Sequence, residues 1–256
     1  MTGAPDHAGG RGDASAPAGD RTELLYLHDA YLREFDATVA AVDGDRVALD
    51  RTAFYPTGGG QPYDTGTVGA ARVAAVRKEA GVVWHALDGP VPPMGSPVHG
   101  VVDWERRHAL MRTHTALHVL CGVIWHEWGK AVTGGNMEPL SARMDFEFDP
   151  LPDRFGATVE ERVNEELAAG RPVEVHFLPR DTALADADLI RTRVNLVPPS
   201  VTELRVVDIV GLDKQADGGT HVANTSEVGR IRVVKTESKG KWNKRIRIEV
   251  LDSGRA

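Results

Sequence analysis

The stretch Met111-Arg112-Thr113-His114-Thr115-Ala116-Leu117-His118-Val119-Leu120 lies inside a helical pattern that runs from Trp104 to about Trp128. His114 and His118 are four residues apart, and residues at this spacing share one face of a helix, one turn above the other. Two imidazoles so placed can bind a single metal ion if a distant segment completes the coordination. The sequence therefore predicts a long helix that carries half of a metal site.

The segment Asp217-Gly218-Gly219-Thr220-His221 offers the other half. Two consecutive glycines let the backbone turn sharply and bring the side chains at both ends toward one point. Asp217 and His221 would then add one oxygen and one nitrogen ligand to His114 and His118, a set that suits zinc. The site would be closed if Asp217 binds the ion, and open if Asp217 only orients a neighbouring ligand.

The residues of the helix argue against a zinc protease and against a cysteine ligand. A zinc protease of the His-Glu-x-x-His type needs glutamate directly after its first histidine, and position 115 is threonine. Cys121 lies on a similar face, but at about 1.5 Å of rise per residue it stands roughly 10 Å from His114, too far to share its ion. We predict that Cys121, the one cysteine of the chain, is a core residue in a protein of a reducing compartment.

A second glycine-rich stretch, Ala53-Phe54-Tyr55-Pro56-Thr57-Gly58-Gly59-Gly60-Gln61-Pro62, precedes the helix. It lacks the Gly-Lys-Ser/Thr ending of a phosphate-binding loop. The stretch therefore indicates either a structural loop or a close approach of backbone to a ligand or another domain.

Basic residues gather near the end of the chain. Between Arg230 and Arg247 the sequence has eight basic residues (230, 232, 235, 239, 241, 244, 245 and 247) and one acidic residue, Glu237. This pattern is typical of a solvated hairpin, or of a strand-turn-strand that binds phosphates with Trp242 available to stack on a base. The formal net charge of −7 argues against indiscriminate nucleic-acid binding but permits a local basic surface.

The 256 residues suffice for one large domain or two modest ones. Residues 1–21, poor in large apolar side chains, predict a disordered tail. Residues 22–99, with a short helix from about Thr22 and several short strands, are typical of a small β-barrel. Residues 100–256 mix helices and antiparallel strands, as in an α+β domain.

No apolar run approaches the roughly 20 residues of a membrane-spanning helix, and the start has no signal-peptide pattern, so we expect a cytoplasmic protein. The expected strands are 37–42, 46–49, 72–76, 82–87, 98–102, 141–148, 172–177, 201–210, 229–235 and 245–251, and the further helices are 159–169 and 182–190.

Three of these segments together resemble one family. The stretch from Phe54 to Pro62, followed by Asp64-Thr65-Gly66, resembles the glycine-rich signature of alanyl-tRNA synthetase editing regions. His114-Thr115-Ala116-Leu117-His118 and Gly218-Gly219-Thr220-His221 resemble the two metal-binding halves of the same editing domain. Their order and spacing over about residues 22–252, without an aminoacylation domain, resemble the freestanding alanyl-tRNA editing proteins of the AlaX type, in their medium-sized class.

The resemblance implies a small β-barrel followed by a two-layer α+β editing domain with an antiparallel sheet and a zinc ion in a cleft. It implies an aminoacyl-tRNA deacylase that acts chiefly on seryl-tRNA(Ala), with glycyl-tRNA(Ala) as the secondary substrate, and whose partner is the tRNA(Ala) acceptor end. Asp217 is expected to take part in catalysis, and Thr115 either selects a serine hydroxyl or lies in the core. The expected substrate-binding residues are Gly58, Gly59, Gly60, Gln61, Lys239, Lys241, Lys244 and Arg245.

The sequence departs from the family at one ligand. The second metal motif of the family usually has cysteine four residues before the histidine, and that position is Asp217 here. Oxygen in place of thiolate makes the site less soft, and Gln215 is the alternative nearby ligand. Two rival functions follow: a tRNA-binding module that has lost catalysis, and a deacylase for seryl-tRNA(Thr). The glycine-rich stretch favours the alanine system.

Overall fold

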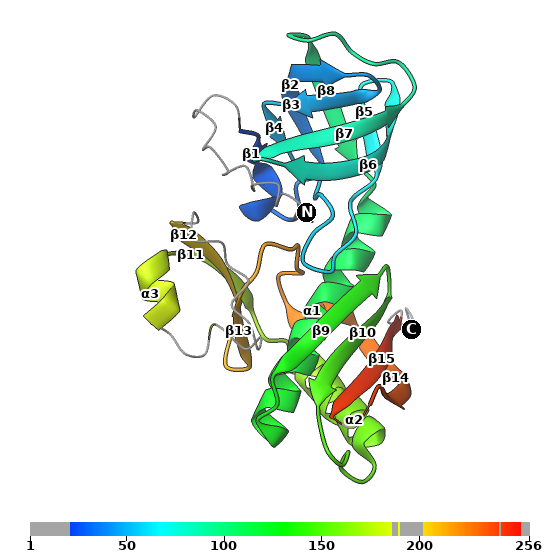
Figure 1. Cartoon of the computed structure of the whole chain (residues 1–256), viewed down its shortest axis with the longest axis vertical. Helices are drawn as coiled ribbons and strands as arrows, with labels where there is room; N and C mark the ends of the chain where they lie inside the picture. The colour runs from blue at the N-terminus through cyan, green and yellow to red at the C-terminus, as the bar shows by residue number, and fades with distance from the viewer. Residues whose placement is uncertain (1–20, 186–188, 190–201, 241, 252–256) are drawn as a thin grey trace, which may run out of the picture.

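The computed structural model describes residues 21–185, 189, 202–240 and 242–251 (Figure 1). The predicted tail, apart from Arg21, lies outside these residues, as does the predicted substrate-binding residue Lys241. None of the helices in the described part of the chain is long and apolar enough to cross a membrane.

Six strands of the first part pair antiparallel in the order β2-β3-β7-β6-β5-β8, and β8 pairs back with β2, which closes the sheet on itself. Buried and exposed residues alternate along β2, so that Phe35, Ala37 and Val39 point into the interior of the closed sheet and their neighbours point to solvent. They join Val47 and Val83 in one apolar core. The strands are β2 (Glu34–Asp43), β3 (Arg46–Leu49), β5 (Gly66–Val68), β6 (Ala71–Glu79), β7 (Val82–Asp88) and β8 (Pro97–Val102).

The predicted helix near Thr22 is wrong. The chain instead forms the two-residue strand β1 (Glu23–Leu24), which pairs with β4 (Arg51–Thr52), and a single 3₁₀ turn, η1 (Leu25–Leu27). The hydroxyl of Thr22 caps no helix, because it accepts a hydrogen bond from the backbone of Val83 in β7 at 2.9 Å. The segment is therefore held along the barrel and does not begin a helix.

The long helix α1 (Trp104–Trp128) follows directly after β8. The Asp103 side chain caps its start by accepting from the Arg106 backbone at 3.2 Å, and Gly129 ends it with a φ of 62°. The predicted division between residues 99 and 100 stays a prediction; β8 crosses that position. The remaining elements are β9 (Val132–Glu138), β10 (Ser141–Glu147), α2 (Phe155–Ala168), β11 (Val173–Pro179), α3 (Arg180–Ala185), β12 (Glu203–Ile209), β13 (Asp213–Ala216), η3 (Thr225–Val228), β14 (Arg230–Ser238) and β15 (Asn243–Leu251).

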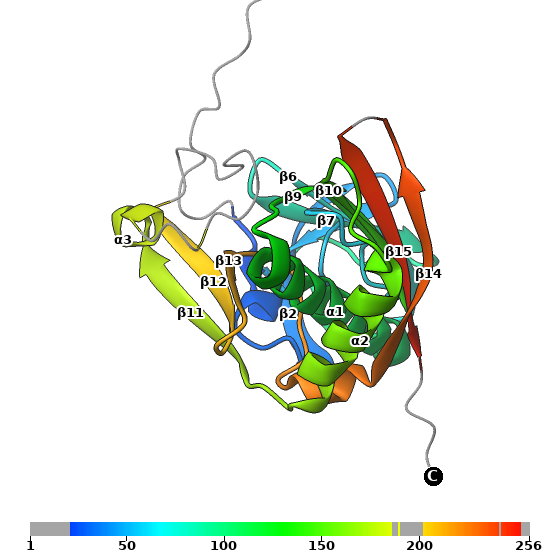
Figure 2. The ribbon, with the colours of Figure 1, turned by 90° about the horizontal axis from the view of Figure 1, so that it is seen from below.

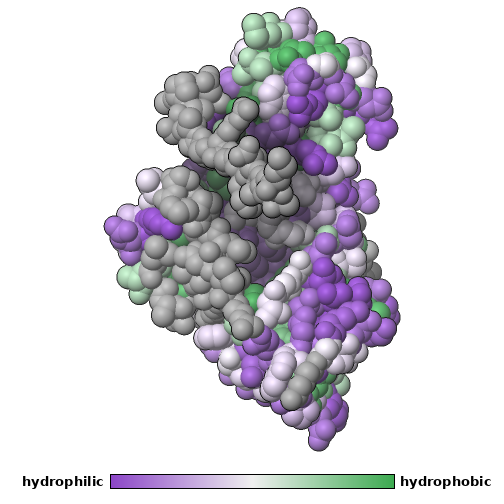
Figure 3. Space-filling model, in the orientation of Figure 1, coloured by the Kyte–Doolittle hydropathy of each residue, from purple (hydrophilic) through white to green (hydrophobic). Residues whose placement is uncertain are grey.

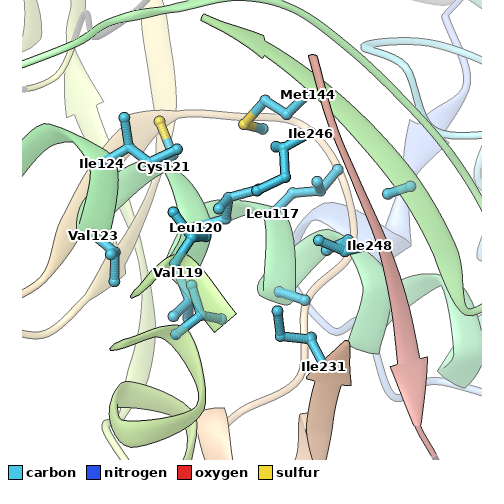
Figure 4. Close-up of a cluster of buried hydrophobic side chains, with 14 of the residues drawn as sticks. Leu117, Val119, Leu120, Cys121, Val123, Ile124, Met144, Ile231, Ile246 and Ile248 are labelled. Atoms are coloured by element: carbon cyan, nitrogen blue, oxygen red, sulfur yellow. The ribbon is translucent and has the colours of Figure 1, made fainter. Parts of the chain in front are cut away.

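The strands of this second part form two antiparallel sheets, of orders β14-β15-β10-β9 and β11-β12-β13. Figure 2 shows α1 between them, with α2 beside it against the four-stranded sheet. Leu117 and Leu120 of α1 pack with Met144 and Ile246 of that sheet (Figure 4). Cys121 is 1% exposed in the same cluster, so its predicted place in the core is confirmed. The predicted α+β class with antiparallel sheets is confirmed, although β9 and β13 were not expected.

A buried ion pair joins α1 to the glycine-rich stretch. Arg107 and Asp64 are both fully buried, and Nε of Arg107 lies 3.0 Å from each carboxylate oxygen. The guanidinium also donates to the carbonyl of Ala30 at 2.9 Å and to that of Ala53. The carboxylate accepts in addition from the Tyr55 backbone at 2.6 Å. These contacts fix the glycine-rich stretch against the helix that carries the two histidines.

Candidate metal centre

Four side chains from two distant segments converge beside α1. His114 and His118 come from the helix, and Asp217 and His221 come from the loop that follows β13. One donor atom from each lies within 4.8 Å of the other three. The rings of His114 and His221 stack with centroids 4.3 Å apart. The structure thus brings together all four residues that the sequence predicted as ligands.

The loop can reach the helix because Gly219 has no side chain. A Cβ atom on Gly219 would lie 2.3 Å from Cε1 of His114 and 2.8 Å from Oε1 of Gln61. Neither Gly218 nor Gly219 has a left-handed backbone, so Gly219 is required for close approach and not for the sharp glycine turn that the sequence suggested. Oδ1 of Asp217 accepts from the Gly219 backbone at 2.6 Å, which closes the loop.

Each of the three imidazoles is held through its Nδ1 atom, which leaves Nε2 for a metal ion. Nε2 of His221 lies 3.2 Å from Oδ1 of Asp217, and Nε2 of His114 lies 3.6 Å from Oδ2 of Asp217. The Nδ1 contacts are His114 with Oε1 of Gln61 at 3.1 Å, His118 with Oδ2 of Asp213 at 2.9 Å, and His221 with Oγ1 of Thr115 at 3.3 Å.

Gln61 connects the glycine-rich stretch to both halves of the cluster. The residue is 1% exposed. Its Nε2 donates to Oγ1 of Thr220 at 2.9 Å, and its Oε1 accepts from the Thr220 backbone at 3.1 Å while facing His114. Gly60 beside it lies against β9, where its carbonyl accepts from the Met137 backbone at 3.3 Å. The stretch therefore makes the close backbone approach to another part of the protein that was one of its two interpretations.

Burial and neighbouring groups together set the protonation of His114, His221 and Asp217. Burial lowers the pKa of His114 to about 4, and burial together with the nearby His114 lowers the pKa of His221 well below its usual value. Burial opposes ionisation of Asp217, but His114 and His221 still hold the pKa of its carboxyl well below the ordinary value. Near pH 7 the carboxylate is therefore ionised and these two imidazoles are neutral, which is the state that metal ligands require.

The donor set fits a zinc ion. Three imidazole nitrogens and one carboxylate oxygen are ligands that zinc accepts, and a tetrahedral ion with bonds of about 2.0–2.1 Å places its donors about 3.4 Å apart. The separations of 3.2 and 3.6 Å between Asp217 and the two imidazoles lie close to this value. Gln215, the alternative ligand, instead donates its amide to Asp213 at 2.8 Å.

Thr115 lies behind His221 and is fully buried. Besides its contact with His221, its hydroxyl oxygen accepts from the Val222 backbone at 3.2 Å. The predicted role of Thr115 in catalysis stays a prediction. In the structure its hydroxyl holds the ring of His221.

The basic hairpin β14–β15 forms two of the four strands of the larger sheet, and the side of this sheet that is seen in Figure 3 is largely hydrophilic. Nζ of Lys244 donates to two oxygens of the turn at 3.0 and 3.1 Å, and Lys239 lies 3.7 Å from a carboxylate of β14. Arg245 forms a double hydrogen bond with Asp145 at 2.7 and 2.8 Å. Trp242 is 59% exposed. A role of these residues in substrate binding stays a prediction.

Asp213 is a site residue that the sequence reasoning missed. It precedes the predicted ligand Asp217 by four residues, and an isolated aspartate there has no spacing that points to His118, 95 residues earlier. The side chain of Gln61 lies between His114 and Thr220, and its predicted role in substrate binding stays a prediction. Only the folding of three separate segments brings these partners together.

Two family profiles match the chain. The profile of the threonyl and alanyl tRNA synthetase second additional domain matches residues 204–247, and that of class II (A) tRNA synthetases matches residues 21–106. The alanyl-tRNA editing protein AlaX-M of Saccharolobus solfataricus is 38% identical over 233 residues, which cover 88% of this chain and 97% of that protein. AlaX-M of Methanosarcina barkeri is 38% identical over 243 residues, 90% of this chain and all of that protein. The alanine–tRNA ligase of Pyrobaculum neutrophilum is 40% identical over 229 residues, which cover 85% of this chain and 25% of the ligase.

Proposed function

The chain belongs to the family of alanyl-tRNA editing proteins and is an aminoacyl-tRNA deacylase, and we propose that it removes serine from mischarged tRNA(Ala) at a zinc ion. Glycyl-tRNA(Ala) is the second proposed substrate. The observation that carries the proposal is the convergence of His114, His118, Asp217 and His221 next to the glycine-rich stretch. We further propose that residues 22–99 and 100–256 act as two units and that the enzyme works in the cytoplasm, where tRNA is charged.

The four clustered residues would hold the ion, and a zinc ion there supplies Lewis-acid chemistry that polarises a carbonyl or water oxygen. Gln61 holds the ring of His114, and Thr115 holds the ring of His221. Asp217 is itself oriented by the Gly219 backbone, so that one oxygen faces its own loop and the other faces His114. Such fixed donors need no reorganisation during the reaction, which is the source of most electrostatic stabilisation in enzymes.

The reaction is hydrolysis of the ester between the amino acid and the terminal ribose. A water oxygen adds to the ester carbonyl carbon, the bond from that carbon to the ribose oxygen breaks, and the ribose oxygen takes up the proton. Free serine and uncharged tRNA leave. An aminoacyl ester is already reactive, so positioning of ester and water is sufficient for much of the rate increase. Sparing of alanine requires a contact with the serine hydroxyl, because size alone discriminates weakly.

The arrangement of the sheet supports a tRNA site that joins the glycine-rich stretch to the basic hairpin. The backbone of Gly60 lies beside Gly135 of β9, whose carbonyl oxygen would be 3.4 Å from a Cβ atom placed on Gly60. In the neighbouring row, Gly134 is paired across the sheet with Asp145, which is paired in turn with Arg245. At about 4.8 Å between strands, Arg245 stands roughly 10 Å from the edge that the stretch covers. We propose that the acceptor end contacts both.

The test is release of serine from seryl-tRNA(Ala), with alanyl-tRNA(Ala) and seryl-tRNA(Thr) measured beside it. Zinc content is determined on the same preparations of the wild type, His114→Ala and the control His108→Ala, a half-buried histidine of the same helix outside the cluster. We expect the wild type to release serine and spare alanine. His114→Ala should lose zinc and at least roughly a hundredfold in rate, and His108→Ala should retain both.

Zinc-loaded wild type that binds tRNA without deacylation would contradict the proposal and favour the non-catalytic module. Faster hydrolysis of seryl-tRNA(Thr) would reassign the substrate. Full activity of zinc-free protein would keep the substrate and remove the metal from the reaction.

A further inference from the structure

We propose that Asp213 is a positioning residue that orients His118 and strengthens it as a metal ligand; the inference rests on the zinc site proposed above. Asp213 is the first residue of β13, and its backbone is fixed by pairing with Ile209 of β12. Its side chain is fully buried. A buried carboxylate is unfavourable unless it accepts hydrogen bonds, so the donors around Asp213 indicate what its side chain does.

The contacts of Asp213 point to the metal cluster. Oδ2 of Asp213 accepts from Nδ1 of His118 at 2.9 Å and from Nε2 of Gln215 at 2.8 Å. A carboxylate can only accept, so the single proton of a neutral His118 ring sits on Nδ1. The lone pair is then on Nε2, on the opposite side of the ring. Since His114 and His221 are also held through Nδ1, all three rings offer the same atom to one ion.

Asp213 differs from the other two supporting residues in charge. Gln61 and Thr115 fix His114 and His221 with neutral groups, whereas Asp213 brings a full negative charge to His118. A carboxylate on the far nitrogen raises the basicity of a ligating imidazole. This site has the oxygen of Asp217 where a soft thiolate would bind zinc more strongly. The charge of Asp213 therefore offsets part of the affinity that the fourth ligand lacks.

A purely structural role for Asp213, as a buried partner that only stabilises the fold, makes different predictions. In that case substitution would lower the stability of metal-free protein and leave the zinc affinity of the folded fraction unchanged. A positioning role predicts that substitution lowers the zinc affinity of the folded protein itself, by a larger factor than the loss of stability accounts for.

The experiment compares Asp213→Asn with the control Asp208→Asn. Asp208 is a half-buried residue of the neighbouring strand β12 and lies opposite Lys214 of β13 in the sheet. Zinc affinity is measured by competition with a chelator, and the Co²⁺-substituted proteins are compared by visible absorption. We expect Asp213→Asn to bind zinc roughly 10- to 100-fold more weakly and to change the Co²⁺ spectrum, because the ring loses its anionic partner. Asp208→Asn should match the wild type in both. Equal zinc affinity and equal spectra for Asp213→Asn and wild type would overturn the proposal.

A second measurement needs no variant and no metal. In ¹⁵N spectra of the metal-free wild type, recorded at a pH at which the ring is neutral, His118 should carry its single proton on Nδ1, whereas a single proton on Nε2 would overturn the inference. This result is separate from the proposed function, which fails if the wild type binds no zinc or releases no serine. The tautomer of His118 is read in either case.

Discussion

Replacement of Arg107 by methionine should destabilise the protein strongly, because it leaves the carboxylate of Asp64 buried without its cation. Both side chains are fully buried. Removing one partner of such a pair costs about 3–5 kcal/mol. The carbonyls of Ala30 and Ala53 lose a donor in the same change. At about 2–4 °C per kcal/mol for a chain of this length, Tm should fall by roughly 6–20 °C.

The assay is thermal unfolding followed by circular dichroism, with zinc present at a fixed concentration. Arg51→Met is the matched control, because Arg51 forms an exposed ion pair with Glu23 at 3.2 Å and should leave Tm unchanged. The double variant Arg107→Met with Asp64→Leu removes both charges and should be more stable than Arg107→Met alone. A Tm for Arg107→Met within about 2 °C of the wild type would refute the reasoning, as would a double variant that is less stable than the single one.

Two further predictions concern pH and the metal. His85 is fully buried between Thr52 and Val47, and burial lowers its pKa from 6.5 to about 4. Below pH 6.5 His85 is protonated in the unfolded chain but stays neutral in the folded protein. The free energy of unfolding should therefore fall by about 3 kcal/mol as the pH is lowered from 6.5 to 4. The free energy of unfolding of His85→Gln, measured in urea at several pH values, should lack this fall. An unchanged dependence of the free energy on pH would show that His85 is not its source. Asp217→Cys introduces a thiolate and should raise zinc affinity about tenfold in a chelator competition, whereas a weaker site would mean that Asp217 is the better ligand in this loop.

The four clustered side chains could be predicted from the sequence as candidate ligands because their signals are local. His114 and His118 have the spacing of one helix face, and the glycines before His221 mark a segment that can approach another closely. The core place of Cys121 followed from simple helix geometry. Even here the reason for Gly219 was not visible, because the crowding by the His114 ring exists only after the two segments meet.

Other parts of the structure depend on partners far along the chain. The strand β9 includes Gly134 and Gly135, residues with low strand propensity, and it is held by pairing with β10. The contact of Asp213 with His118 spans 95 residues, and that of Gln61 with Thr220 spans 159. Neither end of such a pair has a local pattern that identifies the other. The predicted helix from about Thr22 was wrong because the Thr22 hydroxyl accepts a hydrogen bond from the backbone of Val83, 61 residues away.

The bridging position of Gln61 also has a consequence for the order in which the site appears during synthesis. Gln61 leaves the ribosome first, the histidines of α1 follow, and Thr220 and His221 come about a hundred residues after those histidines. At roughly 5–20 residues per second this interval lasts on the order of 5–20 s. During that time the loop that Gln61 and the helix contact has not been made, and no partial product of translation shorter than 221 residues contains all the donors. The proposed metal centre can therefore form only after His221 has been added, and charged tRNAs that serve the same ribosome do not meet it before then.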